Sequence, residues 1–168
     1  DGTNWTDLGS VWPGHITAFA FGGGNVYVAG QFDSIGGVRA KNIAKWNGTT
    51  WDSLGGGLTG ADPFGVYAIA VKGSDVYAGG RFDSAAGVRV NNIAKWDGSG
   101  WSALGNGVGG GFYPTVYALA VNANDLFAGG TFDSAGALSV HDIARWNGAN
   151  WNALAGGVGV ITYGMQAR

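Results

Sequence analysis

Apolar residues along the chain fall in short runs rich in β-favouring types, and clusters of turn residues separate these runs. In the middle of the chain, Val66–Val71 precedes the turn cluster Lys72–Asp75, and Asp75–Phe82 follows as an antiparallel partner. Asn92–Trp96 and Trp101–Leu104 are two further runs of this kind. Such runs are too short for helices but fit strands whose side chains alternate between two faces. The pattern therefore predicts four consecutive antiparallel strands.

The same succession of runs occurs three times along the chain. The repeat is marked by a Phe-Asp-Ser motif and an Ile-Ala-Lys/Arg-Trp motif, which start at Phe32, Phe82 and Phe132 and at Ile43, Ile93 and Ile143. A fixed period of about 50 residues is typical of repeat folds, and four antiparallel strands per period indicate β-propeller blades. We therefore predict an all-β propeller as a single domain over 1–168, with repeats at about 16–54, 66–104 and 116–154.

The pattern also predicts half-blades at both ends of the chain. An outermost strand is expected at 4–8 and a degenerate innermost strand at 160–165, which gives about three and a half blades. Propellers typically have four to eight blades, so the chain is expected to be an arc of a larger propeller. Two blade faces would then be exposed and available for interaction. Either a longer polypeptide or a ring of several chains would complete the circle.

Tryptophans flank a turn in every repeat. The turns Asn47-Gly48, Asp97-Gly98 and Asn147-Gly148 predict tight hairpins, because both residue types tolerate the positive φ of a type I′ turn. For a loop of two or four residues, Trp96 and Trp101 share one face of the hairpin. We expect the repeated tryptophans to hold the structure together, with ligand stacking as the alternative. They are Trp5, Trp46, Trp51, Trp96, Trp101, Trp146 and Trp151.

Composition narrows the classes of function. The net charge is −2 and only 12% of the residues are charged, whereas a nucleic-acid surface needs clustered Lys and Arg. The chain has no cysteine, which excludes disulfides and thiolate chemistry, and it has no apolar run long enough to span a bilayer. Low charge with abundant Trp, Gly, Asn and Thr favours an extracellular, cell-surface or periplasmic protein.

The remaining polar residues give little support for catalysis. Asp33, Asp83 and Asp133 begin equivalent loops, where an Asx-type turn is expected, with the carboxylate accepting a backbone N–H. His15 and His141 stand in different repeats, so a zinc or catalytic pair is a weak interpretation. No catalytic, cofactor-binding or metal-binding motif is recognised. We therefore predict no enzyme activity and no cofactor.

The loops between repeats differ most from one another and supply the candidate binding surface. They are Ser10–His15, Leu58–Phe64 and Val108–Pro114, and in propellers they share a face with the connection inside the next blade. Function usually lies on loops held by a rigid scaffold. We therefore expect a partner or ligand to bind a face that contains Trp12, His15, Arg39, Asp62, Phe64, Arg89, Phe112, Tyr113 and His141.

The repeat motifs resemble a known class of sequence. A strand ends in Gly-Gly at Gly79-Gly80 and Gly129-Gly130, then an aromatic residue precedes a turn and a Trp follows five residues later. This resembles the Kelch repeat, although Trp stands where Kelch has Tyr and the first copy has Ala29-Gly30 instead of the doublet. The full repeat motif, G-G-x-F-D-S…N-I-A-K-W-D-G-x-x-W-x-x-L-G, resembles the propeller repeats of fungal cortical-marker proteins and bacterial secreted surface proteins more closely than it resembles the Kelch repeat.

Together these observations predict a non-enzymatic extracellular or periplasmic module for protein–protein interaction or structural assembly. Its partners would be another protein or further blades of the same polypeptide, and neither nucleic acid nor a transmembrane segment is expected. The alternative is a carbohydrate-binding propeller in which aromatic residues stack on sugars at repeated sites.

Overall fold

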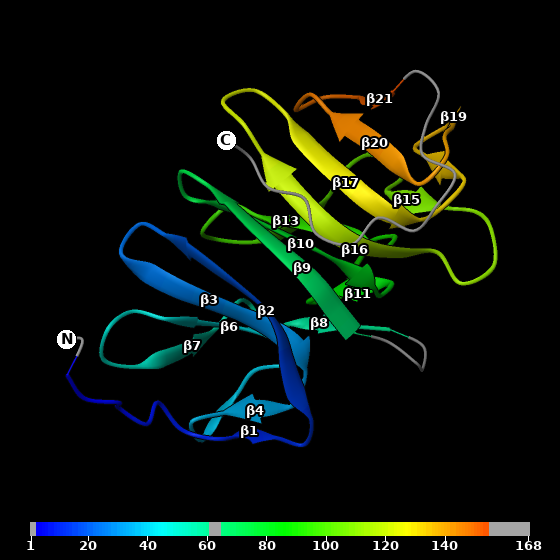
Figure 1. Ribbon diagram of the computed structural model, residues 1–168. Helices are drawn as coiled ribbons and strands as arrows, with labels where there is room; N and C mark the ends of the chain where they lie inside the picture. The colour runs from blue at the N-terminus through cyan, green and yellow to red at the C-terminus, as the bar shows by residue number, and fades with distance from the viewer. Residues whose placement is uncertain (1–2, 61–64, 155–168) are drawn as a thin grey trace.

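The computed structural model describes residues 3–60 and 65–154, and in these residues the protein is all-β. Three four-stranded antiparallel sheets follow one another along the chain, each with its strands in sequence order (Figure 1). The sheets are β2 (His15–Gly22), β3 (Asn25–Gln31), β6 (Ile43–Trp46) and β7 (Trp51–Ser53); β9 (Gly65–Lys72), β10 (Asp75–Arg81), β13 (Ile93–Trp96) and β14 (Trp101–Ala103); and β16 (Thr115–Val121), β17 (Leu126–Thr131), β20 (Ile143–Trp146) and β21 (Trp151–Ala153).

These sheets span 15–53, 65–103 and 115–153, so each begins and ends one residue before the predicted repeats at 16–54, 66–104 and 116–154. The first strand of each sheet lies beside the first strand of the next, with β9 between β2 and β16 (Figure 1). The outermost strands β7, β14 and β21 lie at the far side of each sheet from these strands. The sheets of three successive repeats therefore pack face to face.

Three smaller sheets were not expected, because no strand was predicted between Phe82 and Asn92 or at the equivalent places in the other repeats. In each, a two-residue strand from the loop between repeats pairs with a short hairpin of the next repeat. The sheets are β1 (Val11–Trp12), β4 (Ser34–Ile35) and β5 (Val38–Arg39); β8 (Leu58–Thr59), β11 (Ser84–Ala85) and β12 (Val88–Arg89); and β15 (Val108–Gly109), β18 (Ser134–Ala135) and β19 (Leu138–Ser139).

Small residues allow neighbouring sheets to approach closely. At Gly79 an added Cβ would stand 2.5 Å from Cγ1 of Val116 and 3.2 Å from Cδ1 of Leu119. A strand glycine of this kind marks a place where another element packs directly on the backbone. Ala29 occupies the equivalent position of the first sheet and is fully buried in a cluster that includes Ile69. The apolar core therefore runs between sheets as well as within them.

Buried asparagines also connect one repeat to the next. Asn42 is buried, and its side-chain amide donates to the carbonyl oxygen of Leu58 at 2.6 Å while its Oδ1 accepts from the N–H of Phe32 at 3.0 Å. Asn92 donates in the same way to Val108 at 2.9 Å. Both asparagines have positive φ, which Asn tolerates better than most residues. These bonds hold in place the short strands that contain Leu58 and Val108, which connect each repeat to the next.

Tryptophan indoles form the second type of connection. The Nε1–H groups of Trp101 and Trp151 donate to the carbonyl oxygens of Leu54 and Leu104 at 2.8 Å, and both bonds are buried. Trp51 makes the corresponding bond to the carbonyl of Leu8 at 2.6 Å. Each bond joins the outermost strand of one repeat to the end of the repeat before it.

The strand predicted at 4–8 is not present. Residues 4–10 have no strand pairing, and the side chain of Trp5 is fully exposed. Leu8 nevertheless accepts the indole bond of Trp51, as Leu54 does from Trp101, so the segment lies where an outermost strand would end. It forms no strand because no described strand lies beside it to supply the backbone hydrogen bonds. The innermost strand predicted at 160–165 lies outside the described residues.

We predict that Trp101→Phe lowers the free energy of unfolding by about 2–4 kcal/mol. The variant leaves the buried carbonyl of Leu54 without its donor and removes part of a well-packed ring. Chemical denaturation followed by circular dichroism measures this change. The matched control is Trp5→Phe, which should stay within about 0.5 kcal/mol of the parent protein. Equal effects of the two changes would contradict this role of the indole bond.

Candidate functional site

The loop between repeats and the short hairpin of the next repeat bring predicted residues together at one end of each sheet. Trp12 is the register partner of Ser34, and Ser34 is the partner of Arg39, so the three cross one small sheet side by side. The second repeat places Arg89 beside Ser84 in the same way. The predicted sharing of a surface by these loops therefore has a direct structural basis in the three-stranded sheets.

Large aromatic side chains stand exposed in these loops. Trp12 and Phe112 are largely exposed, and Tyr113 packs edge-on against Phe112 with ring centroids 5.3 Å apart. The guanidinium carbon of Arg81 lies 4.3 Å from the centroid of the Tyr113 ring, within range of a cation–π interaction. Arg81 was not among the predicted site residues, because sequence spacing alone does not show that β10 ends beside the loop before β16.

Tyr113 adopts a backbone conformation that is unusual for a bulky residue. Its φ is 63°, and its carbonyl oxygen accepts hydrogen bonds from the hydroxyls of Thr115 and Thr131. Backbone strain of this kind costs about 1–3 kcal/mol and is concentrated at functional sites. Beside it is a shallow pocket of about 160 Å³ lined by Arg81, Phe82, Asp83, Asn91, Asn92 and Pro114.

The Asx-type turns predicted at Asp33, Asp83 and Asp133 do not form. These residues use their backbone instead: the N–H of Asp33 donates to Trp12 at 3.0 Å, and its carbonyl accepts from Ala40 at 2.9 Å. The three side chains are exposed and accept no hydrogen bond from another described residue. The short hairpin that follows each aspartate satisfies the backbone groups, so the carboxylate is not needed to form the turn.

The two histidines do not build a shared site. His15 is exposed at the start of β2, and His141 is exposed after β19, two repeats further along. Within residues 3–60 and 65–154, no group of three His, Cys, Asp or Glu side chains could hold a metal ion. Two other residues of the predicted face, Asp62 and Phe64, lie outside the described residues.

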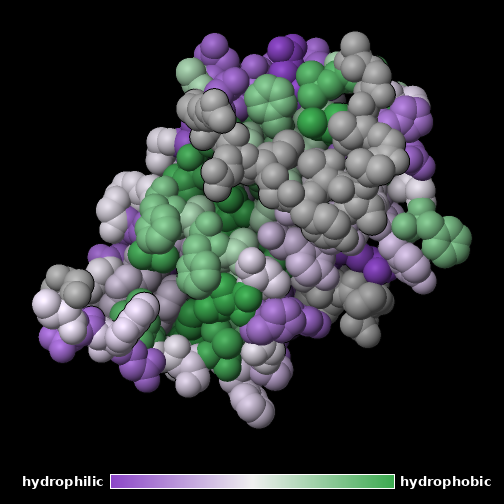
Figure 2. All heavy atoms as spheres, in the orientation of Figure 1, coloured by the Kyte–Doolittle hydropathy of each residue, from purple (hydrophilic) through white to green (hydrophobic). Residues whose placement is uncertain are grey.

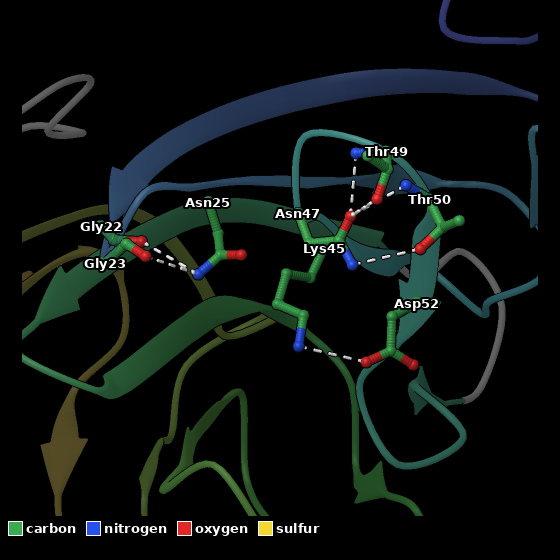
Figure 3. Close-up of polar contacts among 8 residues, drawn as sticks. All are labelled: Gly22, Gly23, Asn25, Lys45, Asn47, Thr49, Thr50 and Asp52. Carbon is green, nitrogen blue, oxygen red and sulfur yellow. Dashed lines mark hydrogen bonds and ion pairs between the residues drawn. The ribbon is translucent and has the colours of Figure 1, made fainter.

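The opposite end of the sheets carries ion pairs and the hairpin turns between tryptophans. Lys95 Nζ lies 2.7 Å from the Asp75 carboxylate, and this hydrogen bond raises the pKa of Lys95. In the first repeat Asn25 replaces that aspartate, and Lys45 pairs with Asp52 on β7 instead, at 3.1 Å (Figure 3). These partly exposed pairs are structural features of the sheet surface and contribute little stability individually.

The hairpin turns are not of type I′, the form that their Asn-Gly and Asp-Gly pairs favour. Each loop has four residues, and only the second, a glycine, has positive φ among the described turn residues. The first residue caps the loop: Asp97 Oδ1 accepts the N–H groups of Ser99 and Gly100 at 2.8 and 2.9 Å. Asn47 makes the same bonds to Thr49 and Thr50 (Figure 3). Hydrogen bonds to the first side chain therefore stabilise the turn, and its first residue does not need the positive φ of a type I′ turn.

The predicted tryptophan pairing is present in all three hairpins. Trp96 and Trp101 are direct register partners with ring centroids 5.6 Å apart, and the other two pairs lie at 5.3 and 5.4 Å. Trp101 and Trp151 are buried, whereas Trp46, Trp96 and Trp146 remain half-buried at the surface. Trp51 is half-buried like its partner Trp46, so only the second and third pairs contain one buried ring, as the predicted packing role requires. The alternative role, stacking on a ligand, stays a prediction.

Sequence reasoning missed the exposed aromatic face of β2. Phe19 is 61% exposed, whereas its equivalents Ile69 and Leu119 are 9% and 7% exposed. Phe21 is 75% exposed on the same side of the strand. Figure 2 shows apolar side chains gathered over the region of β2 and β9. The available signal was the change from aliphatic to aromatic residues at these positions of the first repeat.

No protein-family model matches the chain, and no curated protein matches its sequence significantly. A separate finding concerns membranes: in the described part of the chain, no helix has the length and apolar character needed to cross a bilayer.

The capped turn at Asp97 generates a pH prediction. Hydrogen bonds from Ser99 and Gly100 hold the pKa of the Asp97 carboxyl at about 2, below its ordinary value of 3.8. A depressed carboxyl pKa stabilises the folded state at neutral pH, and that contribution is lost as pH falls from about 4 through 2. An NMR titration of carboxyl carbons should therefore find the Asp97 midpoint near 2.

The matched variant is Asp97→Asn, because Asn47 and Asn147 make the same bonds in the sibling turns. It should fold normally at pH 7 and lose part of the stability change between pH 4 and 2. A midpoint near the ordinary aspartate value would show that the cap does not form.

Proposed function

We propose that the chain is an arc of a β-propeller and a non-enzymatic extracellular or periplasmic module for protein–protein interaction or structural assembly. The propeller interpretation is supported by three successive four-stranded sheets whose first strands lie side by side. It is also supported by the bonds that repeat at the same position of each unit, from an outer tryptophan to the preceding repeat. These are the contacts expected between neighbouring blades.

The observation that carries the assembly function is the exposed face of β2. In the second and third sheets, the corresponding faces are covered by the preceding sheet: Val66 and Val116 are 1% and 0% exposed. Ile16, at the same position of β2, is only half-buried, and Phe19 and Phe21 extend the apolar surface along the strand. This is a surface with the shape and chemistry of an internal interface.

Covering the exposed phenylalanines of β2 with a partner is energetically favourable. Full burial of one Phe side chain contributes about 1.5–3 kcal/mol, so covering Phe19 and Phe21 yields a stabilisation comparable to that of a modest interface. Exposed apolar patches of this kind mark interaction sites in soluble proteins. A sheet of the same repeat type is the partner that fits best, because Ile69 and Leu119 already pack on such sheets within the chain.

The loop surface supports a second contact with a partner protein. Trp12, Phe112 and Tyr113 expose aromatic rings there, and Arg81 stacks on Tyr113. Aromatic residues and Arg are enriched at protein–protein interfaces and dominate their binding energy. The low proportion of charged residues, together with abundant Trp, Gly, Asn and Thr, favours an extracellular, cell-surface or periplasmic location.

We predict that the β2 face drives concentration-dependent association. Sedimentation velocity of the parent chain should show reversible association as concentration rises, and Phe19→Ser with Phe21→Ser should abolish it. Because both rings are already exposed, the double variant should keep its free energy of unfolding within about 1 kcal/mol.

The matched control is Ile69→Ser, at the buried equivalent of Phe19. It should cost about 2–4 kcal/mol and leave association unchanged in the folded fraction. A parent chain that stays monomeric at every concentration, or a double variant that associates equally, would contradict the proposed assembly role of this face.

A further inference from the structure

A groove lies beside the tryptophan pair at the outer edge of the third repeat. It has a volume of about 340 Å³, and its principal lining residues are Asn106, Leu138, Trp146, Asn150 and Trp151. We refer to this set as the outer groove. The first repeat has a groove of about 490 Å³ at the equivalent place, beside Trp46 and Trp51. The feature is therefore produced by the repeat and is not a single irregularity of the surface.

The outer groove is held rigid by contacts that do not involve a ligand. Trp151 is buried and donates its indole N–H to Leu104 at 2.8 Å, and an added Cβ at Gly136 would come within 3.2 Å of its Cδ1. Trp146 packs against it with ring centroids 5.4 Å apart. A preformed site loses less conformational entropy on binding than a flexible one. Trp146 thus presents a fixed aromatic surface.

Polar groups with unused hydrogen-bonding capacity flank this aromatic surface. Asn106 and Asn150 are exposed, and their side-chain amides bond to no other described residue. Only the backbone groups of these two residues are engaged: Asn106 accepts from Asn91, and Asn150 accepts from the side chain of Asn152. A side-chain amide offers both donors and an acceptor, which suits a hydroxyl group that can itself do both.

The charge of the lining selects the class of ligand. None of the residues that line the outer groove is ionisable. A phosphate, a carboxylate or a cationic group would lose hydration without gaining an opposite charge there. The ligand that fits has a flat apolar face for the indole and a rim of neutral donors and acceptors for the amides. A pyranose ring has this combination, with C–H groups on its faces and hydroxyls around its edge.

The middle repeat shows that the two amides are not required by the fold. Gly56 and Gly100 stand at the positions of Asn106 and Asn150, in sheets of the same topology. The asparagines therefore add hydrogen-bonding groups to a scaffold that forms without them. From these observations we propose that the outer groove of the third repeat binds a neutral saccharide, with a sugar ring on Trp146 and its hydroxyls bonded to Asn106 and Asn150.

NMR of the indole N–H groups tests this site on the full chain. The probes are maltotriose, cellotriose, mannotriose and tri-N-acetylchitotriose, each added to about 10 mM, with sialyllactose as a charged comparator. At least one neutral probe should shift the Trp146 resonance, assigned through Trp146→Phe, and leave the exposed Trp5 unchanged. Asn106→Ala with Asn150→Ala should weaken that binding about tenfold or more, which corresponds to about 1.4 kcal/mol.

The control is Asn124→Ala, which removes an exposed amide from the turn between β16 and β17, outside the lining of the outer groove, and should leave the affinity unchanged. The proposal is overturned if no neutral probe moves the Trp146 resonance, if only sialyllactose does so, or if the double variant binds as tightly as the parent. Because Phe19 and Phe21 are not involved, the association of the chain is an independent readout, and failure here leaves the assembly function to its own test.

Discussion

The interaction on which the rest of the structure depends is the hydrogen bond from an outer tryptophan to the repeat before it. The indole of Trp101 reaches the carbonyl of Leu54 at 2.8 Å, and Trp151 reaches Leu104 at the same distance. A buried carbonyl without a donor costs about 1–3 kcal/mol, so each bond makes the position of one sheet dependent on its neighbour. The buried Asn42 and Asn92 reinforce the same dependence from the strands that leave each repeat. Stability in such an array is a sum of unit and neighbour terms.

This dependence explains why the first repeat differs from the other two. The second and third sheets have a preceding sheet on which to pack, and Gly79 shows how closely Val116 and Leu119 approach it. On the corresponding side of the first sheet, Phe19 and Phe21 remain exposed, and residues 4–10 reach the right place for Trp51 without forming a strand. The proposed assembly role follows from this asymmetry: the first sheet carries an internal type of surface without an internal neighbour. At the other edge, the tryptophan pairs of the second and third repeats bury one ring and leave the second ring half-buried, whereas both rings of the first pair are half-buried.

The sequence was informative where one physical pattern dominated. The period, the short apolar runs and the parity of the hairpin loop predicted the all-β structure and the pairing of Trp96 with Trp101, because hydrophobic burial and strand alternation decide both. The type I′ turn that Asp97-Gly98 favours does not form, because the Asp97 side chain caps a four-residue loop, the longer of the two lengths considered. The small sheets, such as the one that contains Ser84, were not predicted because their strands have only two residues. Such strands are too short to show an alternation of apolar and polar residues in the sequence. Arg81 and the outer groove depend on contacts between distant segments, which spacing within one repeat does not encode. Trp12 and Arg39 came together as expected because their strands pair with the same partner.

Native-state hydrogen exchange of the backbone amides tests the central claim that each sheet is stabilised by the neighbour it packs on. In the isolated chain at low concentration, the amides of β2 and β3 should be the least protected, because one face of their sheet is uncovered. The amides of β9 and β10 should be better protected, because their sheet packs between β2 on one side and β16 on the other. Uniform protection across the three sheets, or protection in β2 that equals that in β9, would contradict the account.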